Sequence, residues 1–135
     1  MAGKGFLAVA QDVAVGTTEF HWRAAVIHAY YALFLECRDT LSRWGFAPPR
    51  RDNVHAWVRL RLIFATDTNL QFIGDRLDRL VRWRNQASYN MQSRAFTIPV
   101  IAQDAIHEAS ISLTLLDQID GDPVRRAAAI ASIRP

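Results

Sequence analysis

Residues 80–90 read LVRWRNQASYN, and this stretch sets how the helices around it must pack. Counting back from Arg84 at helical spacing gives Leu80 and Leu77, four and seven residues earlier, so the three side chains share one helical face. Arg84 therefore extends an apolar stripe toward the bundle interior or a groove. Because burying a charge without partners is costly, the polar side chains near Arg84 form either a structural hydrogen-bond node or a binding site.

Length and composition indicate a single domain with a sizeable apolar core. The chain has 135 residues, half of them hydrophobic, and no apolar run approaches the ~18 residues of a membrane span. Asp12 interrupts the short apolar N-terminal segment, so no signal peptide is predicted. Cys37 is the one cysteine and falls on an apolar helical stripe, which favours a buried thiol. We expect a cytoplasmic protein.

The basic residues are almost all arginine. Of the 16 Lys and Arg residues, Lys4 is the only lysine, and the formal net charge is +3. Arginine suits bidentate contact with phosphate and stacking on bases. A GC-rich genome also favours arginine and alanine, so both explanations stay open.

Helical periodicity predicts an all-α chain. Apolar residues recur at steps of three and four, and neither sustained alternation nor an Asn-Gly or Asp-Gly hairpin signal indicates a strand. We expect an antiparallel bundle of about five helices within residues 1–120, and a tail or short helix in residues 121–135. The predicted helices cover roughly residues 5–15, 21–44, 54–64, 70–88 and 97–120.

Capping residues stand at most of the predicted helix starts. Thr17 or Thr18 suits the second helix, Asp52 or Asn53 the third, and Thr97 the fifth, because their side-chain oxygens can accept from free N–H groups.

The motifs of metal and nucleotide chemistry are absent. The sequence has no glycine-rich phosphate loop, no His-Glu-x-x-His and no Cys-x-x-Cys. The four histidines, His21, His28, His55 and His107, are dispersed, and the two on one helix are too far apart for one metal. We predict neither a metal site nor a cofactor.

The remaining candidate residues lie on two helices. Arg84, Asn85, Ser88 and Tyr89 stand near the end of one, and Tyr30–Tyr31 in the middle of another. A buried tyrosine hydroxyl needs a partner, which Asn85 or Arg84 could supply.

A separate basic ridge carries arginines at steps of three among acidic neighbours. This pattern favours a self-paired, solvated face over a nucleic-acid track. The ridge consists of Arg76, Arg79 and Arg82, beside Asp75 and Asp78.

Together these segments resemble the HEPN domains. Residues 24–34 read AAVIHAYYALF, Gly45 and His55 follow, and residues 84–89 read RNQASY. The resemblance is nearest to the small stand-alone branch with an Ala-Tyr-Tyr-Ala motif and an Arg-Asn-x-Ala-Asp-Tyr motif, and it covers roughly residues 6–120. It implies a bundle of about five helices that forms a homodimer.

The resemblance also implies a function and partners. Many HEPN proteins are metal-independent ribonucleases that leave 2′,3′-cyclic phosphates, and many are toxins of toxin–antitoxin or anti-phage defence systems. A minimal nucleotidyltransferase is a frequent antitoxin partner. Arginine and asparagine would hold the phosphate, and histidine would help move the proton.

This chain departs from the ribonuclease motif Arg-x4-6-His. Registering on Arg84 places Tyr89 where the histidine stands, and no histidine occurs between His55 and His107. Ser88 also replaces the usual aspartate. Tyrosine is a poor base at neutral pH because its ordinary pKa is ~10. His28 is the histidine that we expect to face the cluster from the neighbouring helix.

Three interpretations follow from these residues. In the first, the chain is an RNA-binding and interaction subunit in which Arg84, Asn85, Ser88 and Arg82 bind phosphate. In the second, it is an active ribonuclease with Arg84, Asn85 and Tyr89 as catalytic residues. In the third, it is a purely structural subunit.

The tryptophans give a second reason to expect a homodimer. Trp22, Trp44, Trp57 and Trp83 are more large aromatics than one small core easily hides, so we expect an exposed aromatic patch at an interface.

Overall fold

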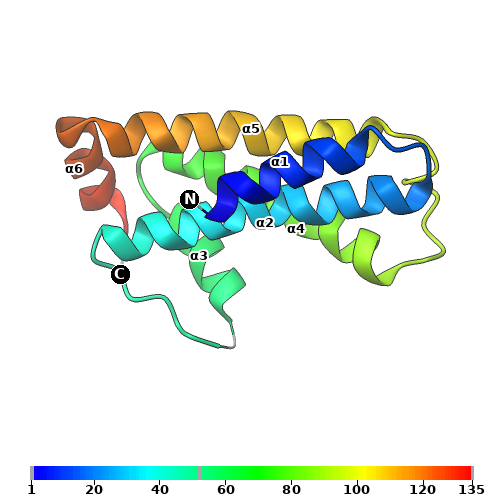
Figure 1. Cartoon of the computed structure of the whole chain (residues 1–135). Helices are drawn as coiled ribbons and strands as arrows, with labels where there is room; N and C mark the ends of the chain where they lie inside the picture. Colours follow the sequence, from blue (N-terminus) through cyan, green and yellow to red (C-terminus); the bar gives the residue numbers. More distant parts are fainter. Residues whose placement is uncertain (1, 52, 135) are drawn as a thin grey trace.

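The computed structural model describes residues 2–51 and 53–134, and these residues fold as an all-α bundle (Figure 1). The predicted fold class is confirmed, including the short C-terminal helix. In chain order the helices are α1 (Ala2–Ala14), α2 (Glu19–Arg43), α3 (Val54–Ile63), α4 (Thr68–Tyr89), α5 (Val100–Gly121) and α6 (Pro123–Ser132).

Helix α2 is the centre of the bundle. Helices α1, α4 and α5 all pack along it, while α3 packs mainly on α4 (Figure 1). Its buried side chains point in several directions, as expected of a helix with neighbours on more than one side. Alanines among them let the neighbouring helices approach closely, and the larger side chains fill the space between. The fully buried set includes Ala25, Val26, Ala29, Ala32 and Leu33.

Helix α4 buries one stripe, made of Leu70, Ile73, Leu77 and Leu80. A Cβ atom added at Gly74 would lie 2.7 Å from the backbone nitrogen of Ile63, so only glycine allows α3 and α4 to approach this closely. The α3–α4 contact fixes the position of α3, which matters for the candidate site.

Two of the predicted helix caps can be judged in the structure. Thr18 begins α2, and its hydroxyl accepts from the backbone N–H of His21 at 3.3 Å. The prediction for Thr97 is wrong, because α5 begins three residues later at Val100. The Thr97 hydroxyl instead donates to the carbonyl of Arg94 at 2.8 Å, within a turn that precedes the helix.

The predicted cap of α3 is only partly described. Asn53 precedes the helix in the left-handed region, with φ of 69°, and makes no side-chain cap hydrogen bond. Asparagine tolerates this conformation better than most residues. Asp52, the alternative cap, lies outside the described residues.

Helix α6 folds back against the end of the bundle. Arg125 donates to both carboxylate oxygens of Asp67 at 2.6 and 2.9 Å, and the backbone N–H of Thr66 donates to the carbonyl of Ser132 at 3.1 Å. Asp67 also caps α4 by accepting from the N–H groups of Asn69 and Leu70 at 2.9 and 3.0 Å. One carboxylate therefore joins the start of α4 to α6.

The expected patch of exposed tryptophans is not found. All four tryptophans are buried or half-buried within the described chain. Trp44 donates to Asp120 at 2.8 Å, and Trp22 donates to the carbonyl of Gly16 at 3.1 Å. Polar partners and neighbouring rings let the small bundle cover the tryptophans, so they no longer support the prediction of a dimer.

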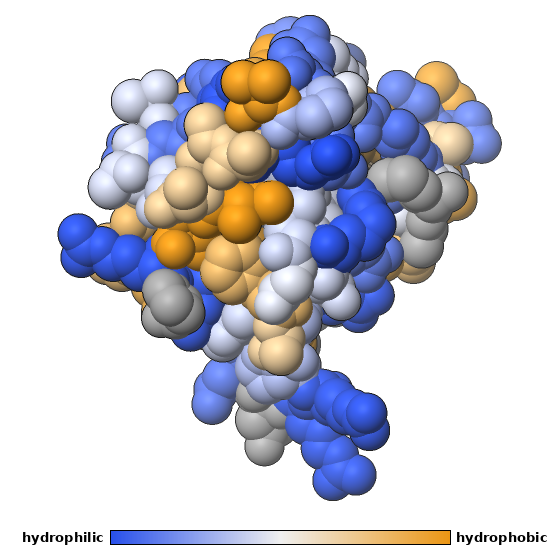
Figure 2. All heavy atoms as spheres, turned by 90° about the vertical axis from the view of Figure 1, so that its left-hand side faces the viewer, coloured by the Kyte–Doolittle hydropathy of each residue, from blue (hydrophilic) through white to orange (hydrophobic). Residues whose placement is uncertain are grey.

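Exposed apolar side chains of other types are spread over several elements. Figure 2 looks onto the end that carries α6, where hydrophobic side chains form a band flanked by hydrophilic ones. Across the described ranges, none of the helices combines the length and the apolarity needed to cross a membrane. The most exposed large apolar side chains are Val15, Phe20, Phe64, Tyr89 and Val124.

Candidate functional site

Arg84 lies inward on α4, as its place on the apolar stripe predicts. Its guanidinium carbon lies 5.1 Å from the ring centroid of Tyr30 and 5.5 Å from that of Tyr31, both on α2. The side chain is half-buried, and one of its terminal nitrogens donates to the side-chain oxygen of Asn85 at 3.0 Å. The cation thus rests on two tyrosine rings, an arrangement in which the ring quadrupole attracts the charge.

No carboxylate of the described residues forms an ion pair with Arg84. Its Nε is buried and has no hydrogen-bond partner there. By contrast, Arg59, Arg76 and Arg82 each pair with an acidic side chain. Arg84 therefore keeps its positive charge uncompensated in a partly desolvated place, which favours an anion as its missing partner.

His55 on α3 completes the group. Its Nδ1 lies 2.5 Å from the hydroxyl of Tyr30, a partner that the sequence did not predict. Of the two predicted partners, Arg84 does act on this hydroxyl, because its charge and hydrogen bond lower the pKa of Tyr30 against the effect of burial. The imidazole stacks on Phe34 at 4.1 Å between centroids and 14° between planes. We call Tyr30, Tyr31, His55, Arg84 and Asn85 the Arg84 cluster.

Burial and positive charge set the protonation states in the cluster. Burial raises the pKa of Tyr30 to about 12, although Arg84 opposes the shift, so the phenol keeps its proton at neutral pH. Burial also lowers the pKa of His55, and the positive charges of Arg84, Arg59 and Arg38 lower it further. His55 is therefore mainly neutral near pH 7.

Sequence reasoning expected His28, not His55, at the cluster. His28 lies on the α1 side of α2, with its ring 5.8 Å from that of Phe6, and its buried Nδ1 has no partner among the described residues. A signal for His55 was present in the periodicity. His55 precedes Val58 by three residues and Leu62 by seven, so it shares the buried stripe of α3.

The other predicted site residues on α4 lie outside this contact. Tyr89 is 77 % exposed, and no hydrogen bond or aromatic contact joins it to the described residues of the cluster. Ser88 is half-buried and likewise makes no side-chain hydrogen bond to them. Arg82 pairs with Asp78 at 3.0 Å, and Arg59 approaches the same carboxylate at 3.5 Å. The prediction that acidic neighbours pair this ridge holds for Arg82.

A second arginine, Arg23, holds the end of α4 in place. One of its terminal nitrogens donates to the carbonyls of Gln86, Ala87 and Asn90 at 3.1–3.2 Å, and the other donates to the carbonyl of Ser93 at 3.2 Å. Arg23 is 3 % exposed. A cation at a helix C-terminus hydrogen-bonds the carbonyls there and interacts favourably with the negative end of the helix dipole. Arg23 therefore fixes the end of α4, the helix that carries Arg84.

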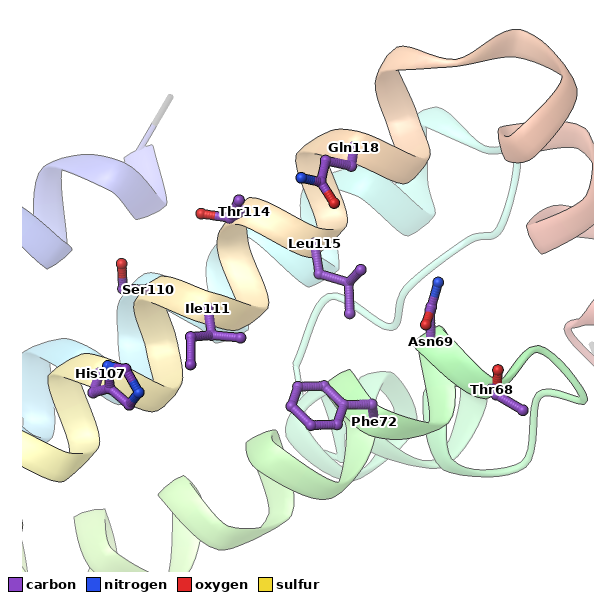
Figure 3. A pocket seen from close by; sticks show the side chains of 9 residues that line it. All are labelled: Thr68, Asn69, Phe72, His107, Ser110, Ile111, Thr114, Leu115 and Gln118. Carbon is purple, nitrogen blue, oxygen red and sulfur yellow. The ribbon is translucent and has the colours of Figure 1, made fainter.

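A well-formed groove of the described surface lies elsewhere. A groove of about 650 Å³ runs between α4 and α5, and Phe72, Ile111 and Leu115 point toward one another across it (Figure 3). Its remaining lining is neutral or histidine, with no arginine or lysine. This groove thus lacks the fixed cation that a phosphate site needs. The polar lining residues are Thr68, Asn69, His107, Ser110, Thr114 and Gln118.

Two further searches bear on the site. Among the residues that the structure describes, no three His, Cys, Asp or Glu side chains come together as metal ligands would. Comparison of the chain with family models, curated proteins and solved structures gave no match.

Proposed function

We propose that this chain is an RNA-binding subunit on a HEPN-like bundle, and that the Arg84 cluster binds a backbone phosphate. The observation that carries the proposal is the half-buried side chain of Arg84, whose guanidinium lies in cation–π contact with two tyrosines and pairs with no described carboxylate. Phosphate oxygens match the planar donor fork of arginine, and Asn85 adds an exposed amide beside it.

The tyrosine rings give the cluster its advantage over an ordinary surface arginine. An exposed arginine loses side-chain entropy when it binds, whereas Arg84 is already held against the rings of Tyr30 and Tyr31. Partial burial also strengthens the attraction for an anion by lowering the local dielectric constant. Both effects favour a phosphate at this position over one bound to the exposed arginines.

The biological setting follows from the resemblance alone. The segments AAVIHAYYALF and RNQASY support a homodimer in a toxin–antitoxin or anti-phage defence system, with a nucleotidyltransferase-type antitoxin as a partner. Light scattering of the purified chain tests the dimer, and a monomer at micromolar concentration would contradict it.

Arg84→Ala tests the proposed phosphate site. We expect it to weaken binding of a short single-stranded RNA by about ten- to a hundredfold, the value of a charge-assisted hydrogen-bond pair. The measurement is a fluorescence titration at several salt concentrations. A plot of log affinity against log salt concentration should have a slope smaller by about one in the variant, because one phosphate contact is lost.

Arg82→Ala is the matched control for that titration. Arg82 stands two residues away on the same helix, but it is exposed and already paired with Asp78. Equal losses in the two variants would mean nonspecific attraction by the basic surface. No loss in either, with both folded, would leave only the structural interpretation.

A metal-independent ribonuclease is the second candidate, and the contact between His55 and Tyr30 beside Arg84 favours it. Here Arg84 would stabilise the charge that develops when the ribose 2′-oxygen attacks the phosphorus. Incubation of wild type and Arg84→Ala with mixed RNA in EDTA separates the candidates. Fragments with cyclic phosphate ends from wild type alone support cleavage, and intact RNA supports binding without cleavage.

A further inference from the structure

The two ring nitrogens of His55 have different surroundings. Nδ1 faces the hydroxyl of Tyr30, which keeps its proton because burial raises its pKa to about 12. We assign the tautomer in which that hydroxyl donates to Nδ1, and the single proton of the neutral imidazole then resides on Nε2. Nε2 makes no hydrogen bond to a described residue, and His55 is half-buried, so this nitrogen is the one that remains for a ligand.

The charges around His55 are positive on every element that packs against it. Helix α4 contributes Arg84, α3 contributes Arg59, and α2 contributes Arg38, besides the phenols of Tyr30 and Tyr31. Carboxylates engage two of these cations, because Asp78 pairs with Arg59 and Asp39 pairs with Arg38. Burial and the remaining positive charge, above all that of Arg84, still oppose protonation of the ring.

An anion beside Arg84 would reverse this balance. A phosphodiester neutralises the guanidinium and places negative oxygen near the imidazole, and both changes favour the imidazolium. The contact with Tyr30 survives protonation, because a hydroxyl can accept from Nδ1–H as well as donate to Nδ1. Nothing in the aromatic packing with Phe34 requires the neutral ring.

We propose that His55 is a second phosphate ligand of the Arg84 cluster, donating through Nε2, and that RNA binding draws a proton onto its ring. The inference rests on the proposed RNA-binding function and adds its regulation: binding strengthens as the pH falls. A phosphodiester does not titrate between about pH 5 and pH 8, so the protein supplies the titrating group in this range, where histidine is the usual one. Affinity should rise about tenfold for each unit by which RNA raises the pKa of His55.

Two substitutions separate donation from proton uptake. The amide nitrogen of His55→Gln replaces Nε2 as a donor but takes up no proton. We expect His55→Gln to match wild type near pH 8 and to lack the gain in RNA affinity near pH 6, the range where histidine titrates. His55→Ala should be weaker at both values. His107→Gln, in the separate α4–α5 groove, should keep the full pH dependence.

NMR titration measures the pKa of the His55 imidazole directly, and RNA would not change this pKa if His55 were only structural. The pKa of His55 should rise when a short single-stranded RNA is added, and the pKa of His107 should stay constant. An unchanged pKa of His55, or an unchanged pH slope in His55→Gln, would overturn the inference. If His55→Ala fails to fold, Tyr30→Phe removes the hydroxyl that holds Nδ1 and should weaken RNA binding near pH 8.

Failure of this inference differs from failure of the proposed function. If Arg84→Ala loses RNA affinity while the His55 variants keep the wild-type pH dependence, the phosphate site stands and His55 is not its ligand. If Arg84→Ala binds RNA as wild type does, the phosphate site itself is refuted.

Discussion

Arg23 and Arg84 both lie between α2 and α4, yet their surroundings are opposite. Arg23 is buried, and its terminal nitrogens donate to four main-chain carbonyls at the end of α4 and just beyond. Arg84 is half-buried on tyrosine rings, and one of its terminal nitrogens donates to the neighbouring Asn85. In both arginines the Nε is buried without a described hydrogen-bond partner. The difference lies at the terminal nitrogens, which four main-chain carbonyls engage in Arg23 and which have fewer described partners in Arg84.

This difference shows how to divide the arginines of an arginine-rich chain. A buried cation whose donors are filled by carbonyls stabilises the fold, since each partner would otherwise be an unsatisfied acceptor. A partly desolvated cation without a described carboxylate partner adds less to stability and is ready for an anion. Arg23 is thus a structural node, and for Arg84 the proposed phosphate site remains the hypothesis that the variants below test.

Arg23→Met should give the largest loss of stability. The thioether keeps much of the apolar packing near Phe96, but all four carbonyls lose the donor that Arg23 supplies. Those of Gln86 and Asn90 keep a backbone N–H partner, whereas those of Ala87 and Ser93 lose the side-chain donor that holds them. We expect the free energy of unfolding to fall by about 3–5 kcal/mol, as when one partner of a buried charged network is removed. Urea unfolding followed by circular dichroism measures it, and a loss below about 1 kcal/mol would refute the structural role.

Asp67→Asn should have the next largest effect. The amide can still cap α4, but it loses the charged pair with Arg125, so we expect a cost of about 1–2 kcal/mol near neutral pH. The hydrogen bonds from Arg125 hold the pKa of Asp67 below its usual range.

The pH dependence of the Asp67 contribution follows from that direction. A carboxyl whose pKa is lower in the folded state stabilises the fold above its ordinary value of about 4 and loses this contribution as the pH falls through the folded value. Wild type and Asp67→Asn should therefore converge in stability in acid. A constant difference down to low pH would mean that shape, and not charge, matters at this position.

Periodicity predicted the parts of the cluster that lie on one helix. Arg84 extends the stripe of Leu77 and Leu80, so its inward direction followed from spacing alone. Arg23 could not be found this way, because its partners are main-chain carbonyls more than sixty residues along the chain. Every residue has a main-chain carbonyl, so the sequence does not distinguish an arginine that binds carbonyls from any other arginine.

His55 shows a different limit. Its place on the stripe of α3 could be predicted, but its contact with Tyr30 depends on how α3 is set against α2 and α4. The close approach at Gly74 fixes that setting, and a contact of this kind depends on three helices at once. Tyr89 shows the reverse case: its position in the motif drew attention, yet its side chain is exposed.

Arg84→Ala should have the smallest effect on stability, which makes it the sharpest test of the comparison. The lost contacts are cation–π interactions on Tyr30 and Tyr31, worth about 1 kcal/mol at a partly exposed site, and removal of an uncompensated charge offsets part of that. The variant should also raise the pKa of His55 toward its ordinary value, since Arg84 is one of the charges that lower it. NMR titration measures this pKa, and urea unfolding measures the stability. A loss of several kcal/mol, as expected for Arg23→Met, would show that Arg84 is a second structural pin; a small loss with a raised pKa of His55 means that the fold holds this charge in place without depending on it, as a site for a phosphate requires.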